Sequence, residues 1–131
     1  MRRIAIDTNI YTSFKANDES VVEAFRKCDF IGVDVTVIAE LFSGFSLGVK
    51  EKRNRQELEA FLNSPRVEML LHGLETAEYY ALIVRRLKAK GRPIPTNNIW
   101  IAANAMKQGL ALYSFDGHFG EIEGLLLMSE S

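Results

Sequence analysis

The sequence predicts an α/β fold in which a mainly parallel sheet of about five strands lies between two layers of helices. Three observations lead to this prediction. Short apolar runs with β-branched residues alternate along the chain with longer segments of helical periodicity. The connections between most of these runs are long enough to hold a crossover helix, as parallel neighbours require. No repeat, low-complexity segment or linker divides the chain, so we expect one domain over residues 1–131.

The apolar runs and the periodic segments locate the individual elements. Strands are expected at residues 3–6, 30–35, 67–71, 110–113 and 125–128. Helices are expected at residues 20–28, 37–42, 50–63, 75–90 and 97–107. Thr36 suits the amino-terminal cap of the second helix, and Asn97 or Asn98 suits that of the last. Gly91 and Gly109 are expected to end the last two helices.

Composition and charge exclude several classes of protein. The net charge is −1, from 16 Lys and Arg against 17 Asp and Glu, whereas a general phosphate binder is usually strongly basic. Nucleic-acid binding is nevertheless not excluded, because the charges are segregated along the chain. Cys28 is the single cysteine, so no disulfide forms within the chain and a reducing compartment is expected. The first apolar run meets Asp7 too early for a signal peptide. The longest uncharged stretch is shorter than the ~20 residues of a membrane helix. We therefore expect a cytoplasmic protein without a membrane segment.

Three acidic residues stand in apolar surroundings. Asp7 and Asp116 each follow an apolar strand, and Glu40 interrupts an otherwise apolar helix. In a parallel sheet Asp7 and Asp116 would both lie at the carboxyl edge, where converging carboxylates repel one another unless a cation lies between them. Oxygen ligands suit Mg²⁺ or Mn²⁺, and such a site suits phosphodiester hydrolysis. Each acid also has a local explanation, because aspartates favour turns and Glu40 would be unremarkable on an exposed helix face.

Four segments together resemble a known family. They are Asp7-Thr8-Asn9, residues 36–41 (TVIAEL), residues 93–103 (PIPTNNIWIAA) and residues 114–119 (SFDGHF). In order and spacing they resemble the motifs of PIN-domain ribonucleases, and most closely those of the VapC-type toxins of toxin–antitoxin pairs. The resemblance covers essentially the whole chain. It implies a three-layer α/β/α PIN-like domain that cleaves RNA with Mg²⁺ (or Mn²⁺), works as a homodimer and is neutralised by a cognate antitoxin.

The same resemblance implies the site. Asp7, Glu40, Asn98 and Asp116 match the catalytic and metal-binding positions, and Asn9 and Ser114 match supporting polar positions. The family has an aspartate where this chain has Asn98, so a weakened or inactive nuclease is expected. Two explanations fit the asparagine: natural divergence toward a role without cleavage, or a deliberate substitution that inactivates a toxic nuclease. The otherwise intact motifs favour the second.

Two other functions remain open. One is a non-catalytic PIN-like module that binds RNA or protein, which Asn98 favours. The other is a metal-dependent phosphatase or DNA nuclease that uses the same carboxylates.

Several further residues have two interpretations each. A basic stretch without acids leads into the third motif and either contacts phosphates or is merely solvated; it contains Arg85, Arg86, Lys88 and Lys90. His72 is expected to be structural or exposed, and His118 to serve in packing. Trp100 is expected in the core or at a dimer contact, with base stacking as the less favoured alternative.

Overall fold

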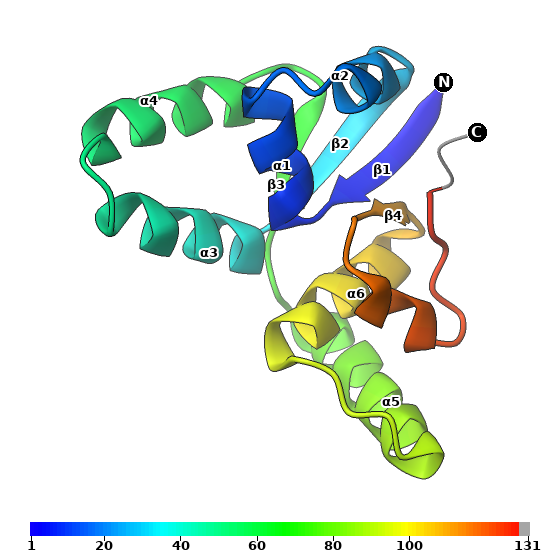
Figure 1. Ribbon diagram of the computed structural model, residues 1–131. Coiled ribbons are helices and arrows are strands. Elements are labelled where there is room, and N and C mark those ends of the chain that lie inside the picture. Colours follow the sequence, from blue (N-terminus) through cyan, green and yellow to red (C-terminus); the bar gives the residue numbers. More distant parts are fainter. Residues whose placement is uncertain (129–131) are drawn as a thin grey trace.

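The sheet of the computed structural model, which describes residues 1–128, has four parallel strands in the order β3-β2-β1-β4 (Figure 1). The strands are β1 (Arg2–Ile6), β2 (Cys28–Asp34), β3 (Val67–Leu70) and β4 (Ala111–Tyr113). Because all of them run the same way, their carboxyl ends meet at one edge of the sheet. The chain therefore brings Asp7, Asp34 and Ser114 to neighbouring strand ends.

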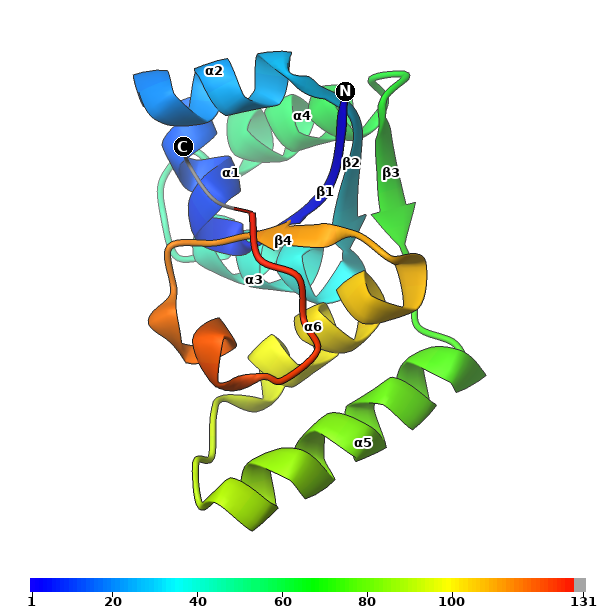
Figure 2. The same ribbon diagram turned by 90° about the vertical axis from the view of Figure 1, so that its right-hand side faces the viewer.

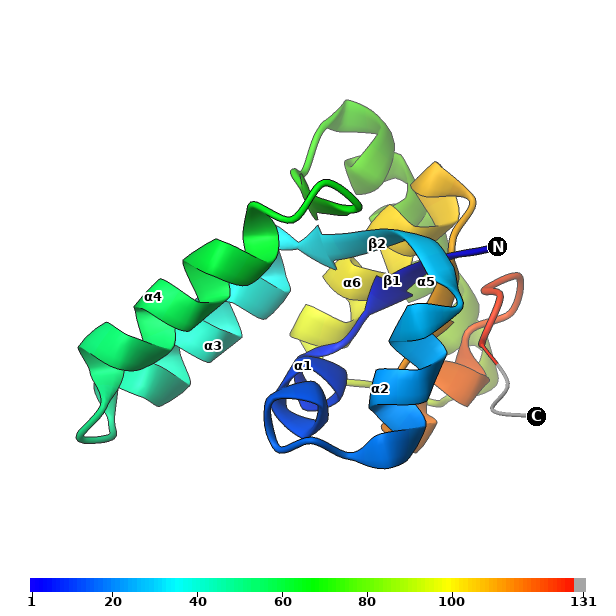
Figure 3. The same cartoon turned by 90° about the horizontal axis from the view of Figure 1, so that it is seen from above.

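Helices cover both faces of this sheet. They are α1 (Thr8–Lys15), α2 (Glu19–Arg26), α3 (Val35–Ser46), α4 (Glu51–Leu62), α5 (Leu74–Lys90) and α6 (Thr96–Gln108), with a 3₁₀ helix, η1 (Gly117–Glu121). Figure 2 shows α1, α2 and α4 on one side of the sheet and α5 and α6 on the other. Figure 3 shows α3 and α4 side by side, extending away from the sheet. The predicted α/β/α architecture is confirmed. Within residues 1–128, every helix falls short of the length or the apolar character that crossing a bilayer requires.

Small residues allow α6 to lie close to the sheet. Ala102, Ala103 and Ala105 are completely buried, and α6 contacts both β4 and α5. The next glycine, Gly109, adopts a left-handed conformation with φ of 66° and ends the helix, as predicted. Gly91 ends α5 in the same way. The close approach fixes where the first turn of α6, with Asn98, lies relative to the strand ends.

Three local predictions are wrong. Residues 125–128 form only an isolated bridge, Leu112 to Leu127, so the described sheet has four strands instead of five. The cap of α3 is Asp34 and not Thr36, because the Asp34 carboxylate accepts a hydrogen bond from the Thr36 amide at 2.7 Å. The cap of α6 is Pro95, without a side-chain hydrogen bond, so both asparagines lie inside the first turn. In addition, α1 was not expected.

A buried polar cluster joins the sheet to α3, α5 and α6. Asn104 of α6 is completely buried, and its amide donates to the Asp34 carboxylate at 2.6 Å and to the Leu71 carbonyl at 3.2 Å. The Asn104 carbonyl accepts from the Thr76 hydroxyl at 3.0 Å, and Thr76 accepts from the Gly73 amide at 3.1 Å. The ends of β2 and β3 and the starts of α3 and α5 are thereby fixed to the middle of α6.

Removing the Asn104 amide is expected to destabilise the protein strongly. The variant Asn104→Ala leaves the buried Asp34 carboxylate without its shortest hydrogen bond, which should lower the free energy of unfolding by roughly 2–4 kcal/mol. Urea unfolding measures this change. Gln108→Ala, at an exposed position of the same helix, is the control and should change stability by less than about 0.5 kcal/mol. A loss below about 1 kcal/mol for Asn104→Ala would contradict the role given to the cluster.

Candidate active site

Four polar side chains from distant parts of the sequence line one hollow of about 440 Å³. They are Asp7, Glu40, Asn98 and Asp116. Asp7 follows β1 and caps α1, and Asp116 follows β4 and caps η1. Glu40 lies in the middle of α3, and Asn98 in the first turn of α6. The structure thus brings together all four side chains singled out in the sequence, while their roles remain predictions.

Asp7 is the most constrained carboxylate of the hollow. It is only 6% exposed and accepts hydrogen bonds from the Ser114 hydroxyl at 2.7 Å and the Thr8 amide at 2.8 Å. Burial raises the pKa of Asp7 above its usual range, and the nearby charges of Glu40 and Asp116 raise it further, against the lowering effect of the two hydrogen bonds. Asp7 is therefore a group whose negative charge the folded protein disfavours.

The two supporting residues expected from the sequence hold the strand ends together. The Asn9 amide donates to Asp7 at 3.3 Å, and its carbonyl accepts from the Phe115 amide at 3.2 Å. The hydroxyl of Ser114, besides donating to Asp7, accepts from the Asp116 amide at 2.9 Å. Asn9 and Ser114 therefore connect Asp7 to the loop that carries Asp116.

Asn98 and His118 both contact Asp116. The Asn98 amide donates to one carboxylate oxygen of Asp116 at 3.0 Å, and the His118 ring nitrogen lies 2.8 Å from the other. Burial alone would raise the pKa of Asp116, but the hydrogen bonds from the His118 backbone amide and from Asn98 outweigh it and leave the pKa lowered. His118 thus contacts a site acid directly, although the sequence favoured a packing role.

Glu40 has two partners that the sequence did not indicate. Its carboxylate accepts from the Thr8 hydroxyl at 2.5 Å and from the Asn97 amide at 3.3 Å. Both partners lie within the quoted motifs, but only the fold shows that they contact Glu40. Thr8 and Asn97 hold the side chain of Glu40 at the mouth of the hollow.

The chemical type of the ligand atoms in the hollow suits a hard divalent cation. They are carboxylate and amide oxygens, the ligands that Mg²⁺ and Mn²⁺ prefer. Within residues 1–128, however, no three Asp, Glu, His or Cys side chains lie close enough together to form a ready-made metal cluster. Mg²⁺ usually keeps several waters and takes only one or two carboxylates from a protein, so the donor set still fits such an ion.

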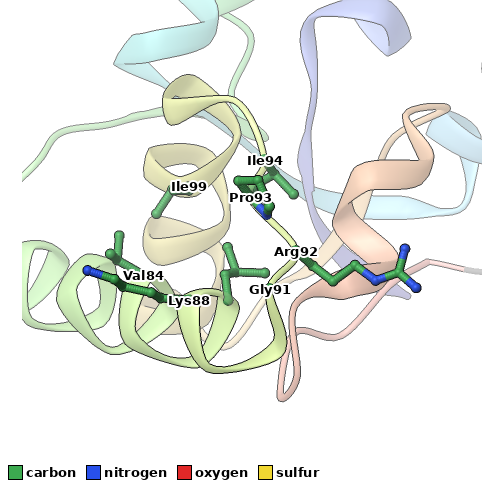
Figure 4. Close-up of a pocket in the computed structure, with 8 residues that line it drawn as sticks. Val84, Lys88, Gly91, Arg92, Pro93, Ile94 and Ile99 are labelled. Atoms are coloured by element: carbon green, nitrogen blue, oxygen red, sulfur yellow. The ribbon is translucent and has the colours of Figure 1, made fainter.

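A separate hollow of about 340 Å³ lies between α5, the turn at Gly91 and the start of α6 (Figure 4). Its walls are mainly apolar, with Val84, Pro93 and Ile99 among them. Figure 4 shows the Arg92 side chain extending away from these walls, and its guanidinium lies 4.0 Å from the Glu121 carboxylate. This hollow offers no carboxylate for chemistry, so the acid-lined hollow is the candidate active site.

The basic stretch on α5 divides into two pairs. Arg86 donates to the Glu123 carbonyl at 3.2 Å, and Lys90 donates to the Glu121 carbonyl at 2.7 Å, so both bind the segment around η1. Arg85 and Lys88 are exposed, and neither has an ion pair with any residue in the part of the chain that the structure describes. Phosphate contact therefore remains a prediction for all four residues, and Arg85 and Lys88 are the two without a contact to the segment around η1.

The sequence profile of the PIN domain family matches residues 4–125, and the chain belongs to this family. It is similar to ribonuclease VapC2 of Rickettsia felis, with 30% identity over 127 residues covering 93% of each chain. Ribonuclease VapC4 of Mycobacterium tuberculosis is 27% identical over 119 residues, covering 91% of this chain and 90% of its own. The structure of VapBC2 from Rickettsia felis bound to a promoter DNA fragment matches with a TM-score of 0.85 and 26% identity, covering 95% of this chain and 96% of that one. The resemblance to VapC proteins is confirmed.

Replacing Asp7 by asparagine is expected to stabilise the metal-free protein at neutral pH. Because the folded state raises the pKa of Asp7, stability linked to this group is full below its unfolded pKa near 3.8 and is lost as the pH rises through the folded pKa. The advantage of Asp7→Asn over the parent should therefore grow with pH. Urea unfolding in EDTA at pH values from about 4 to 8 measures it.

Asp18→Asn is the control, because its effect on stability should change with pH in the opposite direction. Hydrogen bonds from Ser20 and Val21 lower the pKa of the exposed Asp18, so its contribution is present above the unfolded pKa and is lost on acidification. An Asp7→Asn variant that is less stable than the parent at neutral pH would contradict the unfavourable charge assigned to Asp7.

Proposed function

We propose that the chain is a VapC-type endoribonuclease toxin that uses Mg²⁺ or Mn²⁺, with activity weakened by Asn98. The observation that carries this proposal is the hollow in which Asp7, Glu40, Asn98 and Asp116 meet at the carboxyl edge of a PIN-domain sheet. Ligand sites of open α/β sheets gather at this edge. The 30% identity to a VapC ribonuclease over 93% of the chain supports RNA as the substrate over DNA or a phosphomonoester.

The chemistry follows from the arrangement of the acids. Asp7, Glu40 and Asp116 would hold the divalent ion, which when bound neutralises charge and favours attack of water on phosphorus. Ser114 and Asn9 hold Asp7 in place, and Thr8 holds Glu40, so the acids are positioned before substrate binds. Burial and the charges of Glu40 and Asp116 raise the pKa of Asp7, and a bound cation would favour its charged form.

Asn98 weakens this site in two ways. It replaces an anionic ligand by a neutral amide, which lowers the attraction for a divalent ion. It also uses its amide to hydrogen-bond Asp116 at 3.0 Å, which occupies an oxygen that the ion would use. The second effect follows only from the structure, and it acts in the same direction as the first.

A binding function without cleavage is the second candidate, and the bond between Asn98 and Asp116 favours it. An acid that is already hydrogen-bonded by Asn98 and paired with His118 has less need of a cation. The same fold would then bind RNA or an antitoxin without cutting RNA.

The partners proposed for the chain are an antitoxin and a second copy of itself. The similar structure from Rickettsia felis is that of a VapBC2 complex. Leu47 is 88% exposed at the end of α3, next to the half-buried Phe42 and Phe45, and this apolar surface suits a protein partner. The proposed location is the cytoplasm, where RNA and such a partner meet.

Changing Asn98 to aspartate is expected to raise metal-dependent RNA cleavage at least roughly tenfold, about 1.4 kcal/mol of barrier. The change restores an anionic ligand and removes the amide that holds Asp116. Initial cleavage rates in Mg²⁺ and in Mn²⁺, with EDTA and a DNA substrate as controls, test the proposal. Gln108→Glu adds the same charge at the exposed far end of α6, away from the acids, and should not raise the rate.

The thermal stability of Asn98→Asp gives a second readout. In EDTA its melting temperature should fall below that of the parent, because a carboxylate then faces Asp116 instead of an amide donor. Mg²⁺ or Mn²⁺ should raise the melting temperature of the variant more than that of the parent. Equal cleavage by both proteins across metal titrations would show that position 98 lacks the role assigned to it.

Neutralising Arg85 and Lys88 together is expected to weaken RNA binding and flatten its salt dependence. If both contact phosphates, the double change to glutamine should reduce the slope of log affinity against log salt by about 1.4, or about 0.7 per cation on a single strand. Lys50 and Lys52 changed to glutamine near the start of α4 form the control pair. An unchanged slope would show that Arg85 and Lys88 are solvated and do not contact phosphates.

A further inference from the structure

A second hollow, of about 560 Å³, opens directly beside the acid-lined hollow. One face of α3 forms one of its walls, with residues spaced as neighbours on a helix: Thr36, Ala39, Glu40 and Ser43. Asn97 and Trp100, one turn apart on α6, form the other wall together with His72. We call this space the aromatic hollow.

Trp100 belongs to a stack of three rings. Its ring centroid lies 4.5 Å from that of His72, with the planes only 13° apart, and 4.2 Å from that of Tyr80. The His72 ring is held in turn, because its Nε2 atom lies 3.0 Å from the buried Asp34 carboxylate and 3.3 Å from the Thr36 hydroxyl. The aromatic wall is therefore fixed before any ligand arrives.

The two hollows adjoin at Glu40, which lines both. Asn97, on the opposite wall, donates to Glu40 at 3.3 Å and so lies at the junction. A polynucleotide with a phosphate at the acids would place the neighbouring nucleotide at this junction. Around the rings, Thr36, Ser43 and Asn97 offer hydroxyl and amide groups to the edges of a base.

We propose that the aromatic hollow binds the unpaired base of the nucleotide next to the phosphate that a cation at Asp7 and Asp116 would bind. This inference rests on the proposed function and extends it from the chemistry to the recognition of single-stranded RNA. His72 lies at one end of the stack and lines the hollow, so it is the ring on which the base would stack, beside Trp100. Such stacking depends little on sequence. A concave space that opens onto the acids suits a nucleotide better than it suits a protein surface, which would have to insert a side chain beside Glu40.

Trp100 reports on this hollow directly, because it is the only tryptophan of the chain. A short single-stranded RNA added with Ca²⁺ in place of Mg²⁺, to limit cleavage, should quench its fluorescence in a saturable way. The same RNA with an abasic residue at successive positions should lose the quenching at one position only. RNA that binds by an independent assay without changing the fluorescence would overturn the proposal.

A filling variant provides the second test. Ala39 is exposed on α3 and lines the aromatic hollow, so Ala39→Leu occupies the space without removing a buried contact. In the Asn98→Asp background, an abasic residue beside the cleaved bond should lower kcat/KM roughly tenfold, the size expected for one lost base stack. With Ala39→Leu added, the abasic and intact substrates should be cleaved equally. Ala60→Leu, at an exposed site of α4, is the matched control and should preserve the difference.

The outcomes separate this inference from the function on which it rests. Cleavage of RNA with no abasic effect, or with the same effect in Ala39→Leu, overturns the inference and leaves the ribonuclease intact. Absence of cleavage overturns the ribonuclease, and the fluorescence titration then decides whether the hollow binds a base. If Ala39→Leu instead converts a dimer to a monomer in sedimentation velocity, the hollow is a contact between subunits and the inference is wrong.

Discussion

The buried hydrogen bond between Asp34 and Asn104 determines where the candidate site lies. Asp34 is 2% exposed, and its carboxylate is satisfied by the Asn104 amide, the Thr36 backbone and the His72 ring. An unsatisfied buried carboxylate would cost several kcal/mol, so these donors must stay in place. Since α3 begins at this carboxylate and α6 is fixed to it, the bond sets the distance between Glu40 and Asn98 without contacting either.

Asp7 follows β1 and Asp34 ends the neighbouring strand β2, and both are buried, but their surroundings differ. Asp34 faces neutral donors and a histidine, whereas Asp7 faces two other carboxylates. Burial and neighbouring carboxylates thus raise the pKa of Asp7 despite its hydrogen bonds, whereas no carboxylate is among the partners of Asp34. An uncompensated carboxylate at the carboxyl edge of a parallel sheet is typical of a site that awaits a cation or a substrate.

The sequence predicted those features that depend on local pattern. Four strands, the helix ends at Gly91 and Gly109 and the three acids in apolar surroundings were all visible as periodicity, turn chemistry or misplaced charge. The partner of Asp34 was not, because Asn104 is 70 residues away and an asparagine in a small-residue helix carries no local signal. The cap of α6 was missed for a related reason. Asn97 and Asn98 are good caps in isolation, but in the fold their amides donate to Glu40 and Asp116.

The same two hydrogen bonds explain why the chain tolerates an asparagine in an acidic site. An amide supplies Asp116 with a donor that a fourth carboxylate could not supply, and His118 adds a second contact. Glu40 is held likewise by Thr8 and Asn97. Donors of the protein itself therefore offset part of the repulsion among the acids that a cation would otherwise offset. The carboxylate whose negative charge remains unfavourable is chiefly that of Asp7. Rigidity of the metal-free site and affinity for metal are opposed here, since every donor that satisfies an acid is one that the ion must displace.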